Sequence, residues 1–249
     1  MNQEKPLIEI CCGTADDVFE AAKGGADRVE LNSAVFLGGL TPSIGALKTA
    51  QKAGLEIMAM IRPRQGGFCY TDLEFETMLA DAHALIEAGA DGLVFGILHE
   101  DGTVDEKRCA KLLEATKGTP CVFHRAIDVT PDWRSALEII CSLGFRRVLT
   151  SGCAPSVQYG AAVIREMVEL SNGRAEILPG GGVNLNNARE IVKITGCSQI
   201  HASMSAKRRD SSTMTNPAIH FCGAVYPPDD VYSAPDQGMI RKLREEFRD

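Results

Sequence analysis

Ionisable side chains stand within or at the ends of several short apolar segments of this sequence. Glu9 and Glu30 lie within two of them, Arg62 ends a third, and His124 ends a fourth, with Arg125 next in the loop. Burying a charge in such a segment lowers the stability of the fold unless the charge is paired, so its presence there can indicate a function. We interpret His124 as a general acid or base, and Glu9 and Glu30 as carboxylates that transfer protons or orient other groups.

A second set of residues has the chemistry of an anion site. Arg62 and Arg125 could clamp a phosphate or a carboxylate, and Asp128 follows Arg125 in the same loop as a further catalytic candidate. Backbone N–H groups of glycines and side-chain hydroxyl groups would donate further hydrogen bonds to the anion. These residues are Gly180, Gly181, Gly182, Ser151 and Ser203. Together they predict an enzyme that acts on a small phosphorylated or carboxylated metabolite.

Each of these interpretations has an alternative. Glu9, Glu30, Arg62 and Arg125 could neutralise one another as a polar plug, and the glycine run could be a tight turn without a ligand. Glu9, Glu30 and His124 could also bind a divalent metal, although the nearby arginines would oppose a cation. No lysine stands at the end of an expected strand, which argues against Schiff-base chemistry.

The segments that must position these residues alternate between two patterns along the chain. Apolar runs predict strands at 7–11, 28–31, 56–61, 92–95, 121–124, 147–150, 176–178 and 199–202. Helices are expected at about 14–23, 42–53, 72–88, 105–117, 132–143, 156–171, 185–194 and 236–248. Glycines such as Gly144 and Gly196 should end helices in the left-handed conformation. This order predicts an α/β fold, a (β/α)8 TIM barrel with one domain over residues 1–249.

One segment, 205–235, breaks this alternation. It contains no convincing periodic run and holds four prolines, so we expect a long loop after the eighth strand. Because the carboxyl ends of barrel strands form the active face, this loop could be a lid or an oligomer arm. If it serves assembly alone, the chain would be a non-catalytic barrel.

Composition limits the compartment and the partners. The formal net charge of −7, without a prominent basic cluster, argues against nucleic acid or an anionic membrane as a partner. The sequence has no signal-peptide core and no run of 18 consecutive apolar residues. Its nine cysteines are irregularly spaced and are expected to be reduced thiols. We therefore expect a cytoplasmic protein.

Several ordered segments resemble the CutC copper-homeostasis family. They are 25–31, 38–43, 60–64, 91–96, 123–126, 147–152 and 179–182, and the similarity extends over about residues 8–205. The resemblance implies a TIM barrel in the cytoplasm that forms a homodimer or a higher homo-oligomer. It also implies a role in copper homeostasis, with Cu(I) bound in the cytosol.

The resemblance further implies two cysteine ligands for Cu(I), one on each of the first two strands. Cys11 matches the first position, whereas Asn32 stands at the second. An amide is a poor ligand for soft Cu(I), and Cys12 should point to the opposite face of its strand. A second departure lies at 64–68, Arg-Gln-Gly-Gly-Phe, where the family has an acidic residue. The alternative to copper binding is the enzyme of unassigned reaction described above.

Overall fold

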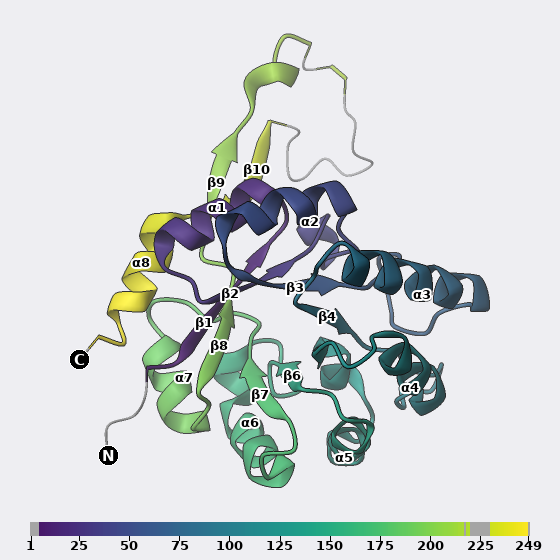
Figure 1. Cartoon of the computed structure of the whole chain (residues 1–249). Helices are drawn as coiled ribbons and strands as arrows, with labels where there is room; N and C mark the ends of the chain where they lie inside the picture. The colour runs from purple at the N-terminus through teal and green to yellow at the C-terminus, as the bar shows by residue number, and fades with distance from the viewer. Residues whose placement is uncertain (1–4, 217, 220–229, 249) are drawn as a thin grey trace.

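Eight parallel strands form a nearly closed barrel in the computed structural model, which describes residues 5–216, 218–219 and 230–248 (Figure 1). The strands are β1 (Leu7–Cys12), β2 (Arg28–Leu31), β3 (Glu56–Met60), β4 (Gly92–Phe95), β5 (Cys121–Phe123), β6 (Arg147–Thr150), β7 (Glu176–Pro179) and β8 (Gln199–Ala202). From β1 to β7 each strand pairs with the next strand in the chain, and β8 pairs with β1. Among the described residues no ladder joins β7 to β8, which lie side by side. The predicted TIM barrel is confirmed.

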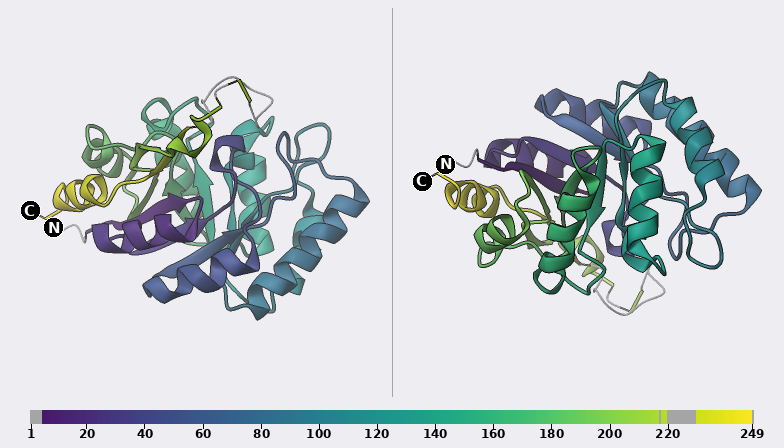
Figure 2. Two further views of the ribbon diagram at one scale, coloured as in Figure 1. Left: turned by 90° about the horizontal axis from the view of Figure 1, so that it is seen from above. Right: turned by 90° about the horizontal axis from the view of Figure 1, so that it is seen from below.

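Helices surround the strands, as the two views of Figure 2 show. They are α1 (Ala15–Gly24), α2 (Ile44–Ala50), α3 (Asp72–Glu87), α4 (Glu106–Ala115), α5 (Trp133–Leu143), α6 (Val157–Ser171), α7 (Ala188–Thr195) and α8 (Gln237–Glu245). Thr14 begins α1 with a capping box that includes Asp17. Gly144 and Gly196 end α5 and α7 with φ of 86° and 71°, as the sequence predicts. No helix in the described part of the chain is long and apolar enough to cross a membrane.

The interior of the barrel has an apolar part and a polar part. The side chains of the apolar part come from β3 to β7 and form one cluster, Met58, Met60, Val94, Val122, Leu149 and Leu178. The polar part lies where β1, β2 and β8 meet. There Glu9 pairs with Arg28, whose guanidinium also donates to Gln199 at 2.7 Å. Gln199 in turn donates to Glu176 at 3.0 Å.

A polar plug therefore exists, but its members differ from those expected. The parallel register places Glu9 opposite Arg28, and the two side chains form a buried ion pair. Arg62 and Arg125 lie beyond the ends of β3 and β5 and bind other groups. The predicted neutralisation of Glu9 and Glu30 by these two arginines is wrong, because neighbouring strands supply the partner.

The segment after β8 is not the loop that its sequence predicts. It begins as β9 (Ser205–Arg209) and ends as β10 (Val231–Pro235), which pair antiparallel and project beyond α1 and α2 (Figure 1). Four of the five β9 residues are exposed, so no apolar periodicity marks the strand. Residues 217 and 220–229 of this segment lie outside the described part of the chain.

Two glycines allow the loop after β6 to approach α6 closely. A Cβ atom at Gly160 would lie 1.9 Å from the carbonyl oxygen of Ser151, and one at Gly152 would lie 2.2 Å from the carbonyl oxygen of Gly160. Both obstacles are backbone atoms, which cannot rotate away. The position of Ser151 at the open face of the barrel thus depends on glycine in α6.

We predict that Gly160→Ala lowers the free energy of unfolding by at least about 2 kcal/mol, because the added methyl group forces α6 away from the loop. Urea unfolding followed by circular dichroism measures this change. Gly67→Ala is the matched control, since nothing lies within 4 Å of a Cβ there. Equal stabilities of the two variants would contradict the prediction.

Candidate functional site

Cys11, Glu30 and His201 converge at the carboxyl ends of β1, β2 and β8. One potential ligand atom from each residue lies within 4.8 Å of the other two. We call these three residues the Cys11 cluster. Register explains part of this arrangement, because Cys11 lies opposite Glu30 across the β1–β2 ladder. No other group of three potential metal ligands occurs among the residues that the structure describes.

Glu30 is a buried carboxylate with incomplete hydrogen bonding. Its Oε2 accepts from the Asn32 amide at 2.9 Å and lies 3.8 Å from the Cys11 Sγ atom. Its Oε1 is buried and has no hydrogen-bond partner. Burial raises the pKa of Glu30, and burial also raises the pKa of the Cys11 thiol. Burial thus disfavours the charged form of both groups, and a bound cation would offset this effect.

Glu9 fixes the imidazole ring of His201. Its Oε1 lies 2.7 Å from Nδ1 of His201, while its Oε2 pairs with Arg28. Burial raises the pKa of Glu9, but the hydrogen bond from His201 and the charge of Arg28 outweigh this and lower it to about 2. Burial lowers the pKa of His201, yet Glu30, Cys11 and Glu9 raise it well above the usual value. A carboxylate that orients a histidine is a common support for a metal ligand.

His124 and Arg62 form a separate group near the loops that follow β2 and β3. Arg62 donates to the carbonyl oxygens of Gly39 at 2.9 Å and Gly66 at 2.7 Å, so it ties these loops together. The His124 ring packs against Phe68, and its buried Nε2 has no hydrogen-bond partner. Burial and then the charge of Arg62 lower the pKa of His124 to about 3. The ring is therefore neutral at physiological pH.

Asp128 organises the loops that follow β5 and β6. Its carboxylate accepts from the Arg125 Nε atom at 2.8 Å, from the Ser151 backbone at 2.9 Å and from the Cys153 backbone at 3.1 Å. Thr150 donates to the same carboxylate. Arg125 also donates to the Ser151 hydroxyl at 2.7 Å. These bonds hold the guanidinium of Arg125 at the edge of a cavity.

This cavity lies between the ends of β7 and β8 and has a volume of about 410 Å³. Its walls include Arg125, Gly181, Gly182, His201 and Ser203. A Cβ atom at Gly181 would lie 3.1 Å from the Arg125 guanidinium, so glycine lets the backbone approach that cation closely. The N–H of Gly180 donates to the carbonyl oxygen of Thr150, so it joins β7 to β6 and is not free to bind an anion. Cations and close backbone are the features that bind an anion.

The sequence-predicted residues thus divide into three groups that share the open face of the barrel. Cys11, Glu9 and Glu30 belong with His201; His124 belongs with Arg62; and Asp128, Arg125 and Ser151 hold the edge of the cavity together with the glycine turn. Sequence reasoning assigned no role to His201. Its signal was the same as that of His124, an ionisable residue near the end of an apolar strand.

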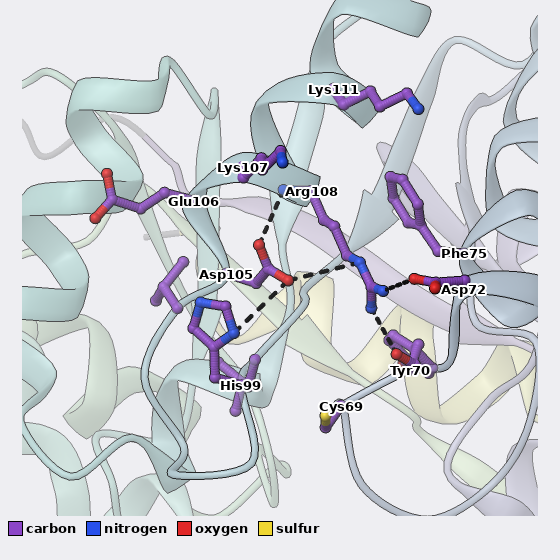
Figure 3. Close-up of a pocket in the computed structure, with 12 residues that line it drawn as sticks. Cys69, Tyr70, Asp72, Phe75, His99, Asp105, Glu106, Lys107, Arg108 and Lys111 are labelled. Carbon is purple, nitrogen blue, oxygen red and sulfur yellow. Dashed lines mark hydrogen bonds and ion pairs between the residues drawn. The ribbon is translucent and has the colours of Figure 1, made fainter.

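A larger cavity of about 740 Å³ is lined by residues of α3, of α4 and of the segments that precede these helices (Figure 3). Four of its charged or ionisable side chains, Asp72, His99, Asp105 and Arg108, contact one another. Arg108 donates to the carbonyl oxygen of Tyr70 at 2.5 Å and pairs with Asp72 and Asp105. His99 lies 3.8 Å from Asp105. None of the sequence-predicted site residues lines this cavity.

Comparison with known proteins agrees with the sequence resemblance. The CutC family model matches residues 6–206. A CutC family protein of Treponema denticola is 54% identical over 224 residues, which cover 90% of this chain and 91% of the relative. The chain belongs to the CutC family. The human copper homeostasis protein cutC homolog is 40% identical, with 95% of this chain and 87% of the relative covered.

A solved structure of the CutC protein from Streptococcus agalactiae shares the fold. The two structures superpose with a TM-score of 0.75 and 37% sequence identity, over 79% of this chain and 97% of that chain. In the present CutC chain, the second cysteine position that the resemblance implies is Asn32. Its amide donates to Glu30 at 2.9 Å and to the Cys11 Sγ atom at 3.6 Å. Asn32 thus orients two members of the Cys11 cluster.

We predict that the buried, neutral His124 makes this CutC protein less stable in acid. An unfolded histidine binds a proton below about pH 6.5, whereas the folded ring binds one only near pH 3. Stability therefore falls as the pH decreases between these values, by at most about 1.4 kcal/mol per pH unit for one group. His124→Phe should make the dependence less steep by up to this amount.

Urea unfolding at a series of pH values between about 6.5 and 4 tests the prediction. The control is His83→Phe, which removes an exposed histidine in place of the buried one. An unchanged slope in His124→Phe would contradict the assignment of a neutral buried ring.

Proposed function

We propose that this protein takes part in copper homeostasis in the cytosol and binds Cu(I) through Cys11, as a homodimer or a higher homo-oligomer. Membership of the CutC family and the names of its human, mouse and worm relatives, copper homeostasis protein cutC homolog, support the role in copper homeostasis. The support for the binding site comes from this chain itself, in which the potential metal ligands of Glu30 and His201 lie close to the Cys11 sulfur. The subunit number and the compartment remain predictions from the sequence.

The observation that carries this proposal is the convergence of Cys11 and His201. A thiolate is the protein ligand that soft Cu(I) prefers, and imidazole also suits copper. His201 therefore offers the second ligand that Asn32 cannot supply. Cys11 is partly buried, whereas Glu30 and His201 are buried. Two of the three donors in the Cys11 cluster thus fit Cu(I), whereas the Glu30 carboxylate is a harder donor.

We predict that the purified protein binds one Cu(I) per chain under reducing conditions and that Cys11→Ala abolishes this binding. His201→Ala should weaken it by at least about tenfold, since one of two favourable ligands is lost. Titration against a chromogenic Cu(I) chelator measures both effects.

Cys153→Ala is the matched control, because Cys153 is exposed and lies outside the Cys11 cluster. Its affinity for Cu(I) should equal that of the unmodified chain. If Cys11→Ala binds Cu(I) as tightly as this control, the proposed site is refuted.

A second candidate function follows from the cavity of about 410 Å³. We propose that it accepts the phosphate or carboxylate of a small metabolite, on which the protein would act as an enzyme. Arg125 supplies a charge at its wall, Asp128 and Ser151 hold that charge in place, and Gly181 and Gly182 expose backbone. The assignment of His124 as general acid or base stays a prediction of the sequence.

We predict that a sugar phosphate or a dicarboxylate stabilises the folded protein. A ligand at about 100 times its Kd adds about 2.7 kcal/mol to the free energy of unfolding. Arg125→Ala should remove this gain, whereas Lys107→Ala, a substitution at the other cavity, should retain it. Thermal-shift screening of such a panel measures the gain. The lack of any stabilising anion would argue against the enzyme.

A further inference from the structure

The charges inside the polar part of the barrel occupy two levels. In the deeper level Glu9 pairs with Arg28, and Arg147 pairs with Glu176 at 2.9 Å. Each carboxylate there has an arginine partner. In the level nearer the open face, Glu30 has no arginine partner among the described residues. Its neighbours are the Cys11 thiol, the Asn32 amide and the His201 imidazole.

Two buried oxygen atoms in the outer level lack any hydrogen bond. They are Oε1 of Glu30 and Oδ1 of Asn32, whose residues are 4% and 1% exposed. Leaving a buried acceptor unsatisfied costs about 1–3 kcal/mol, and more when the group is charged. A folded protein normally offers such a carboxylate a proton donor or a cation. The unsatisfied carboxylate oxygen of Glu30 is therefore in the environment expected of a metal ligand.

The donor types identify the cation. A thiolate, an imidazole and a carboxylate are the ligands of zinc sites in proteins, and three protein ligands leave one position for water or a substrate oxygen. Copper(I) makes no use of a carboxylate when softer donors are at hand. The thiolate of Cys11 and the carboxylate of Glu30 would together balance two positive charges. The presence of Glu30 is therefore explained by a divalent ion.

We infer that the Cys11 cluster also binds a divalent cation of the zinc class, with Cys11, Glu30 and His201 as its three protein ligands. Asn32 and Glu9 orient Glu30 and His201, respectively. The inference rests on the same cluster as the proposed copper function, but it additionally requires Glu30. The divalent ion and Cu(I) would compete for Cys11 and His201. His201 also lines the cavity that contains Arg125, so one side chain is shared by the proposed cation site and this cavity.

The test measures Zn²⁺ and Cu(I) affinities of the same variants by competition with chromophoric chelators. The unmodified chain should bind one Zn²⁺. Glu30→Gln should weaken Zn²⁺ binding by at least about tenfold while its Cu(I) affinity stays within about threefold. Cys11→Ala should lose both ions. Glu76→Gln, which removes an exposed carboxylate from α3, should bind both ions as the unmodified chain does.

Each outcome decides between the proposals. Absence of Zn²⁺ binding, or equal Zn²⁺ affinity in Glu30→Gln and Glu76→Gln, overturns the inference and leaves the copper proposal intact. Binding of Zn²⁺ without binding of Cu(I) supports the inference and overturns the copper proposal.

A spectrum of the unmodified chain tests the inference even if Glu30→Gln fails to fold. With Co²⁺ as the probe, the ligand set predicts a sulfur-to-cobalt charge-transfer band together with strong visible bands of a four-coordinate ion. Cys11→Ser should lose the charge-transfer band. Weak visible bands without a sulfur band in the unmodified chain would overturn the inference.

Discussion

The buried pairing of Glu9 with Arg28 and His201 is the interaction on which the rest of the barrel mouth depends. It joins β1 to β2 and β8, so one carboxylate satisfies a cation below it and fixes a ring beside it. Because Glu9 takes both of these partners, the Glu30 carboxylate accepts its hydrogen bonds from the Asn32 amide and the Cys11 thiol. Charges in the low-dielectric interior must be paired, and Glu9 uses the available cations. One oxygen of the Glu30 carboxylate is therefore left without a hydrogen bond from the residues that the structure describes.

The open face divides its tasks among neighbouring strands. β1, β2 and β8 gather the atoms that suit a metal ion, whereas the loops after β5, β6 and β7 gather the groups that suit an anion. His201 belongs to both regions, since it is a member of the Cys11 cluster and a wall of the cavity. Arg62 and Asp128 hold loops in place by binding backbone groups. The chemistry therefore rests on side chains whose neighbours are fixed before any ligand arrives.

Local signals made much of the fold predictable. Apolar strand patterns and helix-ending glycines such as Gly144 depend only on residues that are close in the sequence. The eight barrel strands accordingly begin and end within one residue of the predicted positions. The site was less accessible, because its contacts join distant segments. Nothing in the sequence shows that Arg62 binds the carbonyl oxygens of Gly39 and Gly66, or that His201 meets Glu9. β9 was missed because exposed strands carry no apolar alternation.

The β9–β10 hairpin presents strand edges outside the barrel, where they could pair with a strand of another molecule. Such edges promote aggregation unless charge or shape blocks them. Lys207, Arg208 and Arg209 are consecutive and exposed along β9, so a second hairpin in the same register would meet like charges. Arg208 pairs with Glu20 and Arg209 with Asp230, and the three cations together disfavour edge-to-edge pairing of two hairpins. High salt, which screens them, would weaken that protection.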